Sequence, residues 1–568
     1  MKSALRLTMP TIILLILLSV AAGADPDPVY AEHGMVVSAN RLASEIGVDI
    51  MQQGGNAIDA AVATGFALAV VHPQAGNIGG GGFMVIHLSG GKNLTLDFRE
   101  QAPAAAHRDL FLDSSGTVIP KRSTYSHQAA GVPGSVDGLL RAWRDYGSGN
   151  ISRRKLLAPA IKLAKKGFPI TRRYARYLNH SREFFKRDPG ARAIFVKAGD
   201  TPWQSGDRLV QKDLATTLKL IARKGRSGFY QGSVAQKIVT EMQQDSGLIT
   251  SADLANYASV YHKPVNGEFR GLDVVSMPPP SSGGVLIIQM LNMLEQYELD
   301  SLDWNSSAYI HLLTEVERRA YADRSEHLGD PDFWQVPLEM LISEKYAIQR
   351  IQDIHLNQAT PSAEILPGEN WPAESPETTH FSVIDKAGNA VSTTTTLNFS
   401  FGCGIVVEGA GFFLNNEMDD FSSKPGVPNA FGLLGNEANA IQPGKRMLSS
   451  MTPTIVFKDE TPFLIVGAPG GSTIITTVLQ VILNSVVHTM DIQAAVAAPR
   501  VHSQWYPDVV YGEIRALPSD VITNLEQLGH TVETHPWGYM GQANCILADS
   551  TGIYGGADPR GENAAVGY

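Results

Sequence analysis

The chain has 568 residues, of which 43% are hydrophobic and 18% are charged. This composition is typical of a globular protein, and the length allows a large core and two to four domain-sized units. The formal net charge of -10 argues against nucleic acid as the main partner.

The first 24 residues have the pattern of an export signal. Lys2 and Arg6 supply positive charge, Thr11 to Val20 is nearly all apolar, and small residues follow at Ala22 to Ala24. We therefore predict cleavage before Asp25. An uncleaved anchor is the alternative, but the apolar run is short for a membrane span. We expect an exported protein, periplasmic or secreted, that is not attached to a membrane after signal removal.

The next segment alternates between helix and strand. Arg41 to Gln53 has the pattern of an amphipathic helix, and Ala57 to Val71 is apolar on nearly all sides, which predicts a buried helix. The glycine run Gly79 to Gly82 precedes the predicted strand Phe83 to Leu88. A phosphate-binding loop would lie between a strand and a helix and end in Gly-Lys-[Ser/Thr], so close backbone packing explains these glycines better.

A second short strand is predicted from Asn93 to Arg99. Arg99 lies between acidic residues, where an arginine is usually part of a surface ion pair. It could instead hold a substrate carboxylate, which a guanidinium binds through two parallel hydrogen bonds. Residues 134 to 340 are predicted to be mainly helical, with clear helices from Val285 to about Tyr297 and from Ser307 to Arg324.

Residues 341 to 377 are polar and rich in proline, which predicts an exposed connector where the chain could be cut. Thr378 to Ile384 and Ala390 to Leu397 then have the pattern of a β-hairpin. Thr378 is either an ordinary residue at the start of a strand or a new N-terminus made by cleavage before it. In the second case its hydroxyl would lie beside its own α-amine, which has a pKa near 8 and can act as a base.

Short strands and tight turns dominate after Thr378. A strand is predicted from Gly402 to Val407, and the loop from Asn415 to Met447 has the length of a functional lid. A further hairpin spans Met451 to Val466 and leads through glycines to an apolar helix from Thr473 to Val487. These glycines indicate either an anion site at the start of the helix or a close turn. The whole pattern predicts an α+β fold.

The cysteine and histidine content does not indicate a metal centre. Cys403 and Cys545 are the only cysteines, and the sequence does not decide whether they pair. The chain has neither a CxxC nor an HExxH motif, and its histidines are scattered. The sequence therefore predicts no metal and no cofactor.

The chain resembles the gamma-glutamyltransferase (gamma-glutamyl transpeptidase) family of N-terminal-nucleophile hydrolases. The resemblance extends from about Met35 to Tyr568 and rests on nine motifs that occur in order along the chain. They are Gly79 to Phe83, Asp97 to Glu100, Pro278 to Gly284, Ala320 to Arg324, Thr378 to His380, Thr396 to Asn398, Asn415 to Phe421, Leu448 to Met451 and Pro469 to Ser472. Any one of them is weak evidence, but all nine in this order are highly specific.

The resemblance implies a four-layer αββα sandwich made of two antiparallel sheets flanked by helices. It also implies that the precursor cuts itself between Glu377 and Thr378 into a large subunit, 25–377, and a small subunit, 378–568, which together form one heterodimer. Thr378 would then act as nucleophile on glutathione and related γ-glutamyl compounds. The γ-glutamyl group would pass to water or to the amine of an amino acid or dipeptide.

The resemblance also assigns site residues. Thr396 matches a second threonine that hydrogen-bonds the nucleophile, and the backbone N–H groups of Gly470 and Gly471 match the oxyanion hole. The residues that match contacts to the substrate's carboxylate are Arg99, Ser449 and Ser450, and those that match contacts to its ammonium are Asn398, Glu417 and Asp420.

Two differences between this sequence and the family pattern bear on specificity. Glu417 stands where some members have Gln, and Phe431 stands where Tyr is frequent, which would remove a hydroxyl from the lid.

Two rival functions are considered. One is an acylase that removes glutaryl side chains, but a glutaryl group lacks the ammonium that Glu417 and Asp420 would pair with. The other is an exported binding protein that keeps the pocket and never processes itself. The complete catalytic set argues against this second function.

Overall fold

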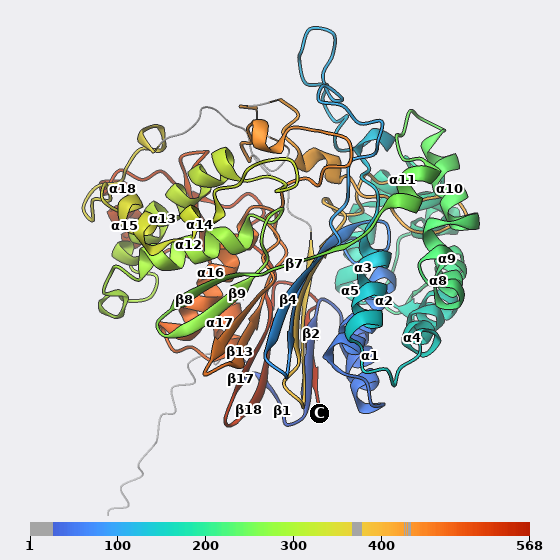
Figure 1. Ribbon diagram of the computed structural model, residues 1–568, viewed down its shortest axis with the longest axis horizontal. Helices are drawn as coiled ribbons and strands as arrows, with labels where there is room; N and C mark the ends of the chain where they lie inside the picture. The colour runs from blue at the N-terminus through green and yellow to red at the C-terminus, as the bar shows by residue number, and fades with distance from the viewer. Residues whose placement is uncertain (1–25, 366–377, 425, 428, 430–432) are drawn as a thin grey trace, which may run out of the picture.

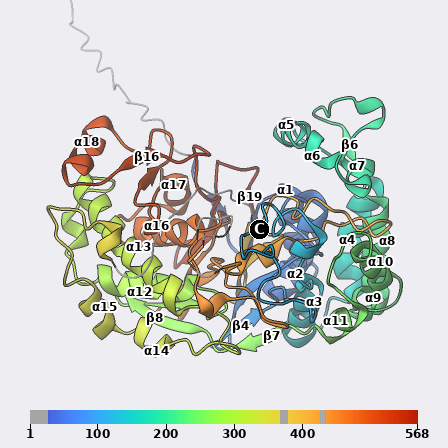
Figure 2. The same cartoon turned by 90° about the horizontal axis from the view of Figure 1, so that it is seen from above.

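The computed structural model describes residues 26–365, 378–424, 426–427, 429 and 433–568 (Figure 1). The predicted signal peptide (1–24), the cleavage-site residue Glu377 and the lid residue Phe431 lie outside these ranges. Two seven-stranded sheets lie face to face at the centre of the molecule, and helices cover their outer faces (Figures 1 and 2). The predicted α+β fold with four αββα layers is confirmed.

The first sheet is antiparallel and has the order β19-β2-β10-β11-β3-β4-β7. Its central pair is the predicted hairpin, in which Thr379 lies opposite Thr395 and Val383 lies opposite Val391. The strands are β2 (Gly34–Ser38), β3 (Gly81–Leu88), β4 (Lys92–Asp97), β7 (Val260–His262), β10 (Thr379–Asp385), β11 (Ala390–Thr396) and β19 (Ala564–Gly567).

The second sheet is also antiparallel and has the order β1-β18-β17-β13-β12-β9-β8. Buried apolar side chains from both sheets, among them Val37, Val85, Ile455 and Ile546, fill the space between the two sheets. The strands are β1 (Val29–Ala31), β8 (Val265–Phe269), β9 (Leu272–Ser276), β12 (Thr454–Lys458), β13 (Thr461–Val466), β17 (Asn544–Asp549) and β18 (Gly552–Ala557).

Helices from the first half of the chain cover the first sheet. α1 (Arg41–Gln52) packs on β2 and β19, and α2 (Ala57–Val71) packs on β10 and β11. Every residue of α2 is buried, as predicted from its apolar sequence, and Asn56 and Asp59 close its N-terminus with reciprocal hydrogen bonds. The remaining helices of this side are α3 (Ser135–Tyr146), α4 (Arg153–Lys166), α5 (Arg172–His180), α6 (Arg182–Phe185), α7 (Pro189–Phe195), α8 (Lys212–Lys224), α9 (Ser227–Tyr230), α10 (Gly232–Met242) and α11 (Ser251–Asn256).

The second sheet is covered by helices from both halves of the chain. α12 (Gly283–Leu294) packs on β8 and β9, α16 (Thr473–Val486) on β13, and α17 (Ile492–Ala497) on β17 and β18. Outside them lie α13 (Ser307–His327), α14 (Leu338–Leu341), α15 (Glu344–Arg350) and α18 (Ser519–Gln527). Two small sheets complete the fold, β5 (Phe168–Pro169) with β6 (Arg208–Leu209), and β14 (Val501–His502) with β15 (Val510–Gly512) and β16 (Val532–Thr534).

The structure differs from the sequence prediction in three places. Within the predicted connector 341–377, residues Glu344–Arg350 form α15, with Ala347 buried. The segment 134–340 contains β7, β8 and β9, which complete one edge of each large sheet. The prediction of a strand from Gly402 to Val407 is wrong, because Phe401, Gly402 and Gly404 have φ values of 64°, 56° and 83° and turn the chain.

Cys403 and Cys545 are buried free thiols in two different apolar cores. Among the described residues, no helix is both long enough and apolar enough to cross a membrane.

Candidate functional site

The two threonines predicted to lie at the reaction centre meet at one end of the β10–β11 hairpin. Thr378 directly precedes β10, and Thr396 is the last residue of β11. The hydroxyl of Thr378 donates to Oγ1 of Thr396 at 3.4 Å, and the backbone N–H of Asn398 donates to the same oxygen at 2.8 Å. The antiparallel register therefore brings the two hydroxyls together.

The predicted close packing of the glycine loop is confirmed. A Cβ on Gly80 would lie 2.0 Å from the carbonyl oxygen of Thr396, and one on Gly79 would lie 2.1 Å from that of Phe413. Asn77 joins the loop to the hairpin, since its Nδ2 donates to the Thr396 carbonyl at 2.8 Å and its Oδ1 accepts from the Gly80 N–H at 2.9 Å. The loop therefore fixes the backbone position of Thr396.

Four charged side chains, three of them buried and Asp420 partly exposed, form a cluster beside the threonines. Nη1 of Arg99 donates to Oε2 of Glu417 at 2.5 Å, and Nη2 donates to Oδ2 of Asp420. Glu100 follows Arg99 in the chain, and its Oε2 lies 3.6 Å from Nη1. Burial raises the pKa of Glu100 to about 8 and also raises the pKa values of Glu417 and Asp420, with Arg99 opposing each shift. The buried Arg99 keeps a raised pKa because the three carboxylates outweigh its desolvation.

The sequence prediction assigned Arg99 to the substrate's carboxylate and the two acids to its ammonium, and the structure pairs these groups with one another. Oε1 of Glu417 is buried and has no hydrogen-bond partner in the described part of the chain. A zwitterion placed here could take over both halves of the ion pairs without leaving a buried charge unpaired. The arrangement therefore suits an α-amino acid group.

The paired serines are held by an arginine that the sequence prediction did not include. Ser449 and Ser450 follow the predicted lid segment, and Nη2 of Arg324 lies 3.4 Å from Oγ of Ser450. Nε of Arg324 also donates to Oγ of Ser282 at 2.9 Å, and that hydroxyl donates to the Ser449 carbonyl at 2.7 Å. The only signal in the sequence was that Arg324 ends one of the nine motifs.

Gly470 and Gly471 form the turn before α16. Their φ values of 139° and 58° favour glycine, and a Cβ on Gly470 would lie 2.5 Å from Oγ1 of Thr473. The turn is held by Thr473, whose hydroxyl donates to the Gly470 carbonyl at 2.7 Å, and by Tyr321, whose hydroxyl donates to the Ser472 carbonyl at 2.5 Å. The turn is thus rigidly positioned at the helix N-terminus.

One pocket of about 320 Å³ brings nearly all the predicted site residues together. Gly470 is not part of the lining but adjoins Gly471, which is. Leu433, Met451 and Ile474 add apolar surface. The remaining lining residues are Arg99, Arg324, Thr378, Thr396, Asn398, Glu417, Asp420, Ser449, Ser450 and Gly471.

Comparison with known proteins identifies the family. Residues 43–568 match the family described as gamma-glutamyltranspeptidase. The chain belongs to the gamma-glutamyltranspeptidase family. It is 47% identical to the glutathione hydrolase proenzyme of Escherichia coli (strain K12), over 97% of this chain and 95% of that protein. The family predicted from the nine motifs is therefore confirmed.

Solved structures agree with this gamma-glutamyltranspeptidase assignment. The cephalosporin acylase from Bacillus halodurans has a TM-score of 0.84 at 27% identity and covers 98% of this chain and 99% of its own. The gamma-glutamyltranspeptidase of Helicobacter pylori has a TM-score of 0.57 at 48% identity, covering 61% of this chain and 97% of its own. The same fold thus occurs in proteins named for two different activities, cephalosporin acylase and gamma-glutamyltranspeptidase.

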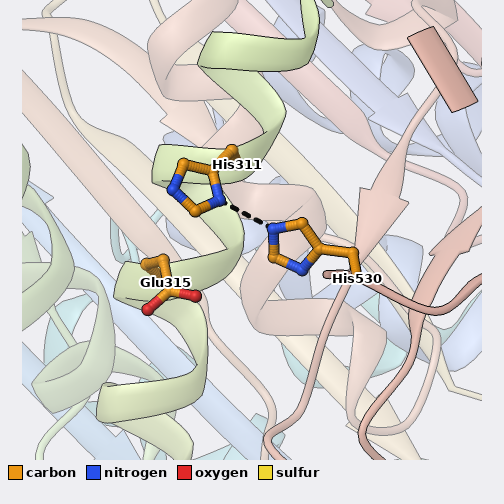
Figure 3. A group of neighbouring side chains, drawn as sticks. All are labelled: His311, Glu315 and His530. Atoms are coloured by element: carbon orange, nitrogen blue, oxygen red, sulfur yellow. Dashed lines mark hydrogen bonds between the residues drawn. The ribbon is translucent and has the colours of Figure 1, made fainter. Parts of the chain in front are cut away.

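Away from the pocket, this gamma-glutamyltranspeptidase chain holds a cluster with metal-ligand chemistry, formed by His311, Glu315 and His530 (Figure 3). Nδ1 of His311 and Nε2 of His530 share a hydrogen bond of 2.7 Å, and Nε2 of His311 bonds to the His355 carbonyl at 2.8 Å. Glu315 is paired with Arg319 at 2.7 Å. The facing nitrogens of the two histidine rings are thus engaged with each other, and the guanidinium next to Glu315 opposes a divalent cation. The cluster acts as a contact between α13 and the chain after α18.

Proposed function

We propose that this protein is a self-processing γ-glutamyl hydrolase and transferase whose nucleophile is the hydroxyl of Thr378. The observation that carries the proposal is the position of Thr378. It lies at the start of a central strand, bonded to Thr396, in a pocket that also contains a buried cation and the two carboxylates paired with it. Membership of the gamma-glutamyltranspeptidase family supports the same chemistry.

Processing would come first. The Thr378 hydroxyl attacks the carbonyl carbon of Glu377, the peptide bond to the Thr378 nitrogen breaks, and an ester forms. Water then hydrolyses this ester and leaves the fragments 25–377 and 378–568, with a free amine on Thr378. The same hydroxyl and amine are then side by side for turnover.

In turnover the Thr378 amine acts as the base, because its pKa near 8 lets it take the hydroxyl proton at neutral pH. The oxygen attacks the γ-amide carbonyl, and the backbone N–H groups of Gly470 and Gly471 receive the negative charge of the tetrahedral intermediate. Removing one such donor typically costs about 2.7–4 kcal/mol of barrier. The protonated amine then gives its proton to the departing nitrogen, which leaves a γ-glutamyl ester on Thr378.

Recognition would use the two poles of the substrate. The α-carboxylate pairs with Arg99 and accepts hydrogen bonds from Ser449 and Ser450, while Arg324 holds the two serines. The α-ammonium donates to Asn398, Glu417 and Asp420. The unpartnered Oε1 of Glu417 supports this assignment, because it is an acceptor with no other use in the described part of the chain.

Water or an amine completes the reaction. Glutathione is the proposed donor, and amino acids or dipeptides are the proposed acceptors, because both present an amine to the ester carbonyl. We also propose that the two fragments remain one heterodimer and that the mature protein is periplasmic or secreted, on the basis of the signal sequence. No cofactor takes part in this scheme.

The test compares wild type with Thr378→Ala by denaturing electrophoresis and by release of p-nitroaniline from γ-glutamyl-p-nitroanilide. We expect two fragments and activity from the wild type, and one uncut, inactive chain from the variant. Thr379→Ala is the matched control, because its hydroxyl lies next in the chain and has no proposed role in attack. Activity in Thr378→Ala would refute the nucleophile. A wild type that stays uncut would favour the binding-protein alternative.

A glutaryl acylase is the second candidate, favoured by the high structural similarity to a cephalosporin acylase. The carboxylates of Glu417, which is buried, and Asp420, which is partly exposed, argue for a substrate with an ammonium group. We expect γ-glutamyl-p-nitroanilide to be cleaved with a kcat/KM at least about a hundredfold above that of glutaryl-p-nitroanilide, because an unpaired buried acid is costly. Faster glutaryl cleavage would reverse the assignment.

A further inference from the structure

A groove of about 870 Å³ lies between helices α4 and α8, which pack side by side at the outer edge of the molecule (Figures 1 and 2). It shares no lining residue with the pocket that contains Thr378. Six cationic side chains line it, and all six residues are exposed. They are Arg154, Lys162, Lys165, Lys166, Lys219 and Arg223. The groove is therefore strongly basic, on a chain whose formal net charge is -10.

The spacing of these residues explains why they meet in one groove. Arg154, Lys162 and Lys165 follow one another at eight and three residues along α4, which keeps them on one face of the helix. Lys219 and Arg223 are four residues apart on α8 and share a face in the same way. Because α4 and α8 pack against each other, the two faces combine into a single surface.

The protein itself does not neutralise this positive charge. No acidic residue lines the groove, and within the described ranges none of the six side chains forms an ion pair. Helix α4 has no aspartate or glutamate at all, and the only acid of α8 is Asp213 in its first turn. The charge is thus available to an anion from outside the molecule.

Other cations on this side of the molecule have acidic partners. Nζ of Lys186 donates to Glu183 at 2.8 Å and to Asp200 at 2.7 Å, and Nζ of Lys197 donates to Asp207 at 2.7 Å. The groove has the opposite arrangement, with like charges three or four residues apart on both helices. Such pairs destabilise a helix slightly, and an external anion would relieve their repulsion.

The apolar part of the lining favours a lipid surface over other anions. Ala158, Ile161 and Ala222 lie among the cations, so the groove can contact both a charged head group and the hydrocarbon beside it. No aromatic residue lines the groove, whereas single-stranded nucleic acid is bound largely by stacking on aromatic rings. The predicted export signal would also bring the chain to a membrane surface.

We propose that the groove between α4 and α8 docks the protein on an anionic phospholipid surface, with the six cations next to the lipid phosphates. Clusters of about four to eight lysines and arginines on a helical surface are typical of binding to anionic lipids. The contact is peripheral and reversible, and it needs no segment that crosses the membrane. The inference rests on the predicted export and does not depend on the role of Thr378.

Co-sedimentation with lipid vesicles tests this docking. The processed, full-length protein is mixed with vesicles of phosphatidylglycerol and phosphatidylcholine in equal parts, or of phosphatidylcholine alone. We expect the wild type to sediment only with the anionic vesicles, and less as the salt concentration rises, because salt screens the attraction. The affinity for anionic vesicles should fall at least about tenfold in a groove variant that carries four substitutions. They are Lys162→Gln, Lys165→Gln, Lys166→Gln and Lys219→Gln.

A control variant changes the net charge by the same amount outside the groove. It carries Lys263→Gln, Lys345→Gln, Lys386→Gln and Lys458→Gln, all at exposed positions. We expect it to bind the anionic vesicles as the wild type does. Both variants should keep the wild-type unfolding midpoint and the cleavage of γ-glutamyl-p-nitroanilide, because neither touches the Thr378 pocket.

Several results would overturn the inference. One is a wild type that does not bind anionic vesicles at low salt, and another is equal binding by the groove variant and the wild type. Equal losses in the groove and control variants would show that only the net charge matters. The wild type and the groove variant are also titrated with an oligoglutamate peptide and with inorganic phosphate. Groove-dependent binding of either one, without binding to vesicles, would assign the groove to an acidic peptide or to free phosphate instead.

Discussion

At the scale of single residues, Thr396 is the contact that orients the proposed nucleophile. Its Oγ1 accepts from both Thr378 and the Asn398 N–H. Thr396→Val keeps the shape of the side chain and removes the acceptor, so we expect kcat to fall about tenfold. Steady-state kinetics on γ-glutamyl-p-nitroanilide measures this, with Thr396→Ser as the control that keeps the hydroxyl. A valine variant with wild-type kcat would contradict the orienting role.

Glu100 gives the protein a predictable dependence of stability on pH. Its pKa is raised by burial to about 8, so the folded state binds its proton more tightly than the unfolded state does. The stabilisation is complete at low pH and is lost as the pH rises towards 8. Glu100→Gln keeps the shape of the side chain without titrating, so the free energy of unfolding should fall less steeply with pH, by up to about 1.4 kcal/mol per pH unit.

Urea unfolding between pH 5 and 8 measures this decline. It is best done in the Thr378→Ala background, so that processing does not vary with pH. The decline in Glu100→Gln should be shallower than in its parent. An equal or steeper decline would show that Glu100 is not the group that titrates.

The sequence identified the members of the site better than it identified their contacts. Most of the polar residues that line the pocket were predicted, because they belong to the motifs that carry the family resemblance. The ion pairs of Arg99 with Glu417 and Asp420 were not predicted, since these residues lie more than 300 positions apart in the chain. Arg324 was missed for a related reason. Arg324 holds the site through its contacts to Ser282 and Ser450, and these contacts exist only because α13, which carries Arg324, packs next to both serines.

At the scale of secondary-structure elements, the glycine loop before β3 offers a test of close packing. A Cβ on Gly80 would lie 2.0 Å from the Thr396 carbonyl oxygen and 2.8 Å from Oδ1 of Asn77. Gly80→Ala should therefore destabilise the protein by about 1–3 kcal/mol and displace Thr396. Gly90→Ala is the control, because a Cβ there meets nothing within 4 Å.

Thermal unfolding and the rate of self-cleavage measure the two consequences. Gly80→Ala should lower the unfolding midpoint and slow cleavage, and Gly90→Ala should do neither. Equal behaviour of the two variants would indicate that the loop adjusts without affecting the hairpin.

Elements with strong local patterns were predicted correctly, and those that depend on distant partners were not. The hairpin β10–β11 and the buried helix α2 carry their own periodicity and turn residues. β7, β8 and β9 are only three to five residues long and are separated by turns. The position of β9 in its sheet depends on pairing with β12, which lies far along the chain. The strand predicted from Gly402 to Val407 failed because backbone angles, which β-branched composition does not reveal, turn the chain there.

At the scale of the whole molecule, the two segments separated by the proposed cleavage are interleaved in both sheets. In the first sheet β10 and β11 of segment 378–568 lie between β2 and β3 of segment 25–377. In the second sheet β12, β13, β17 and β18 lie between β1 and β9. The apolar core between the sheets also draws on both segments. Neither segment can leave without breaking the strand pairs of both sheets.

We therefore predict that cleavage before Thr378 does not release the fragments under native conditions. Separation would expose the apolar interior of both sheets and several unpaired strand edges, at a cost comparable to unfolding. On size-exclusion chromatography the cleaved protein should elute at the volume of uncut Thr378→Ala, while denaturing electrophoresis of the same peak should show two fragments. Low concentrations of urea should leave the peak unchanged, and the fragments should part only within the unfolding transition. Two separate peaks in native buffer would show that the interleaved strands do not hold the segments together.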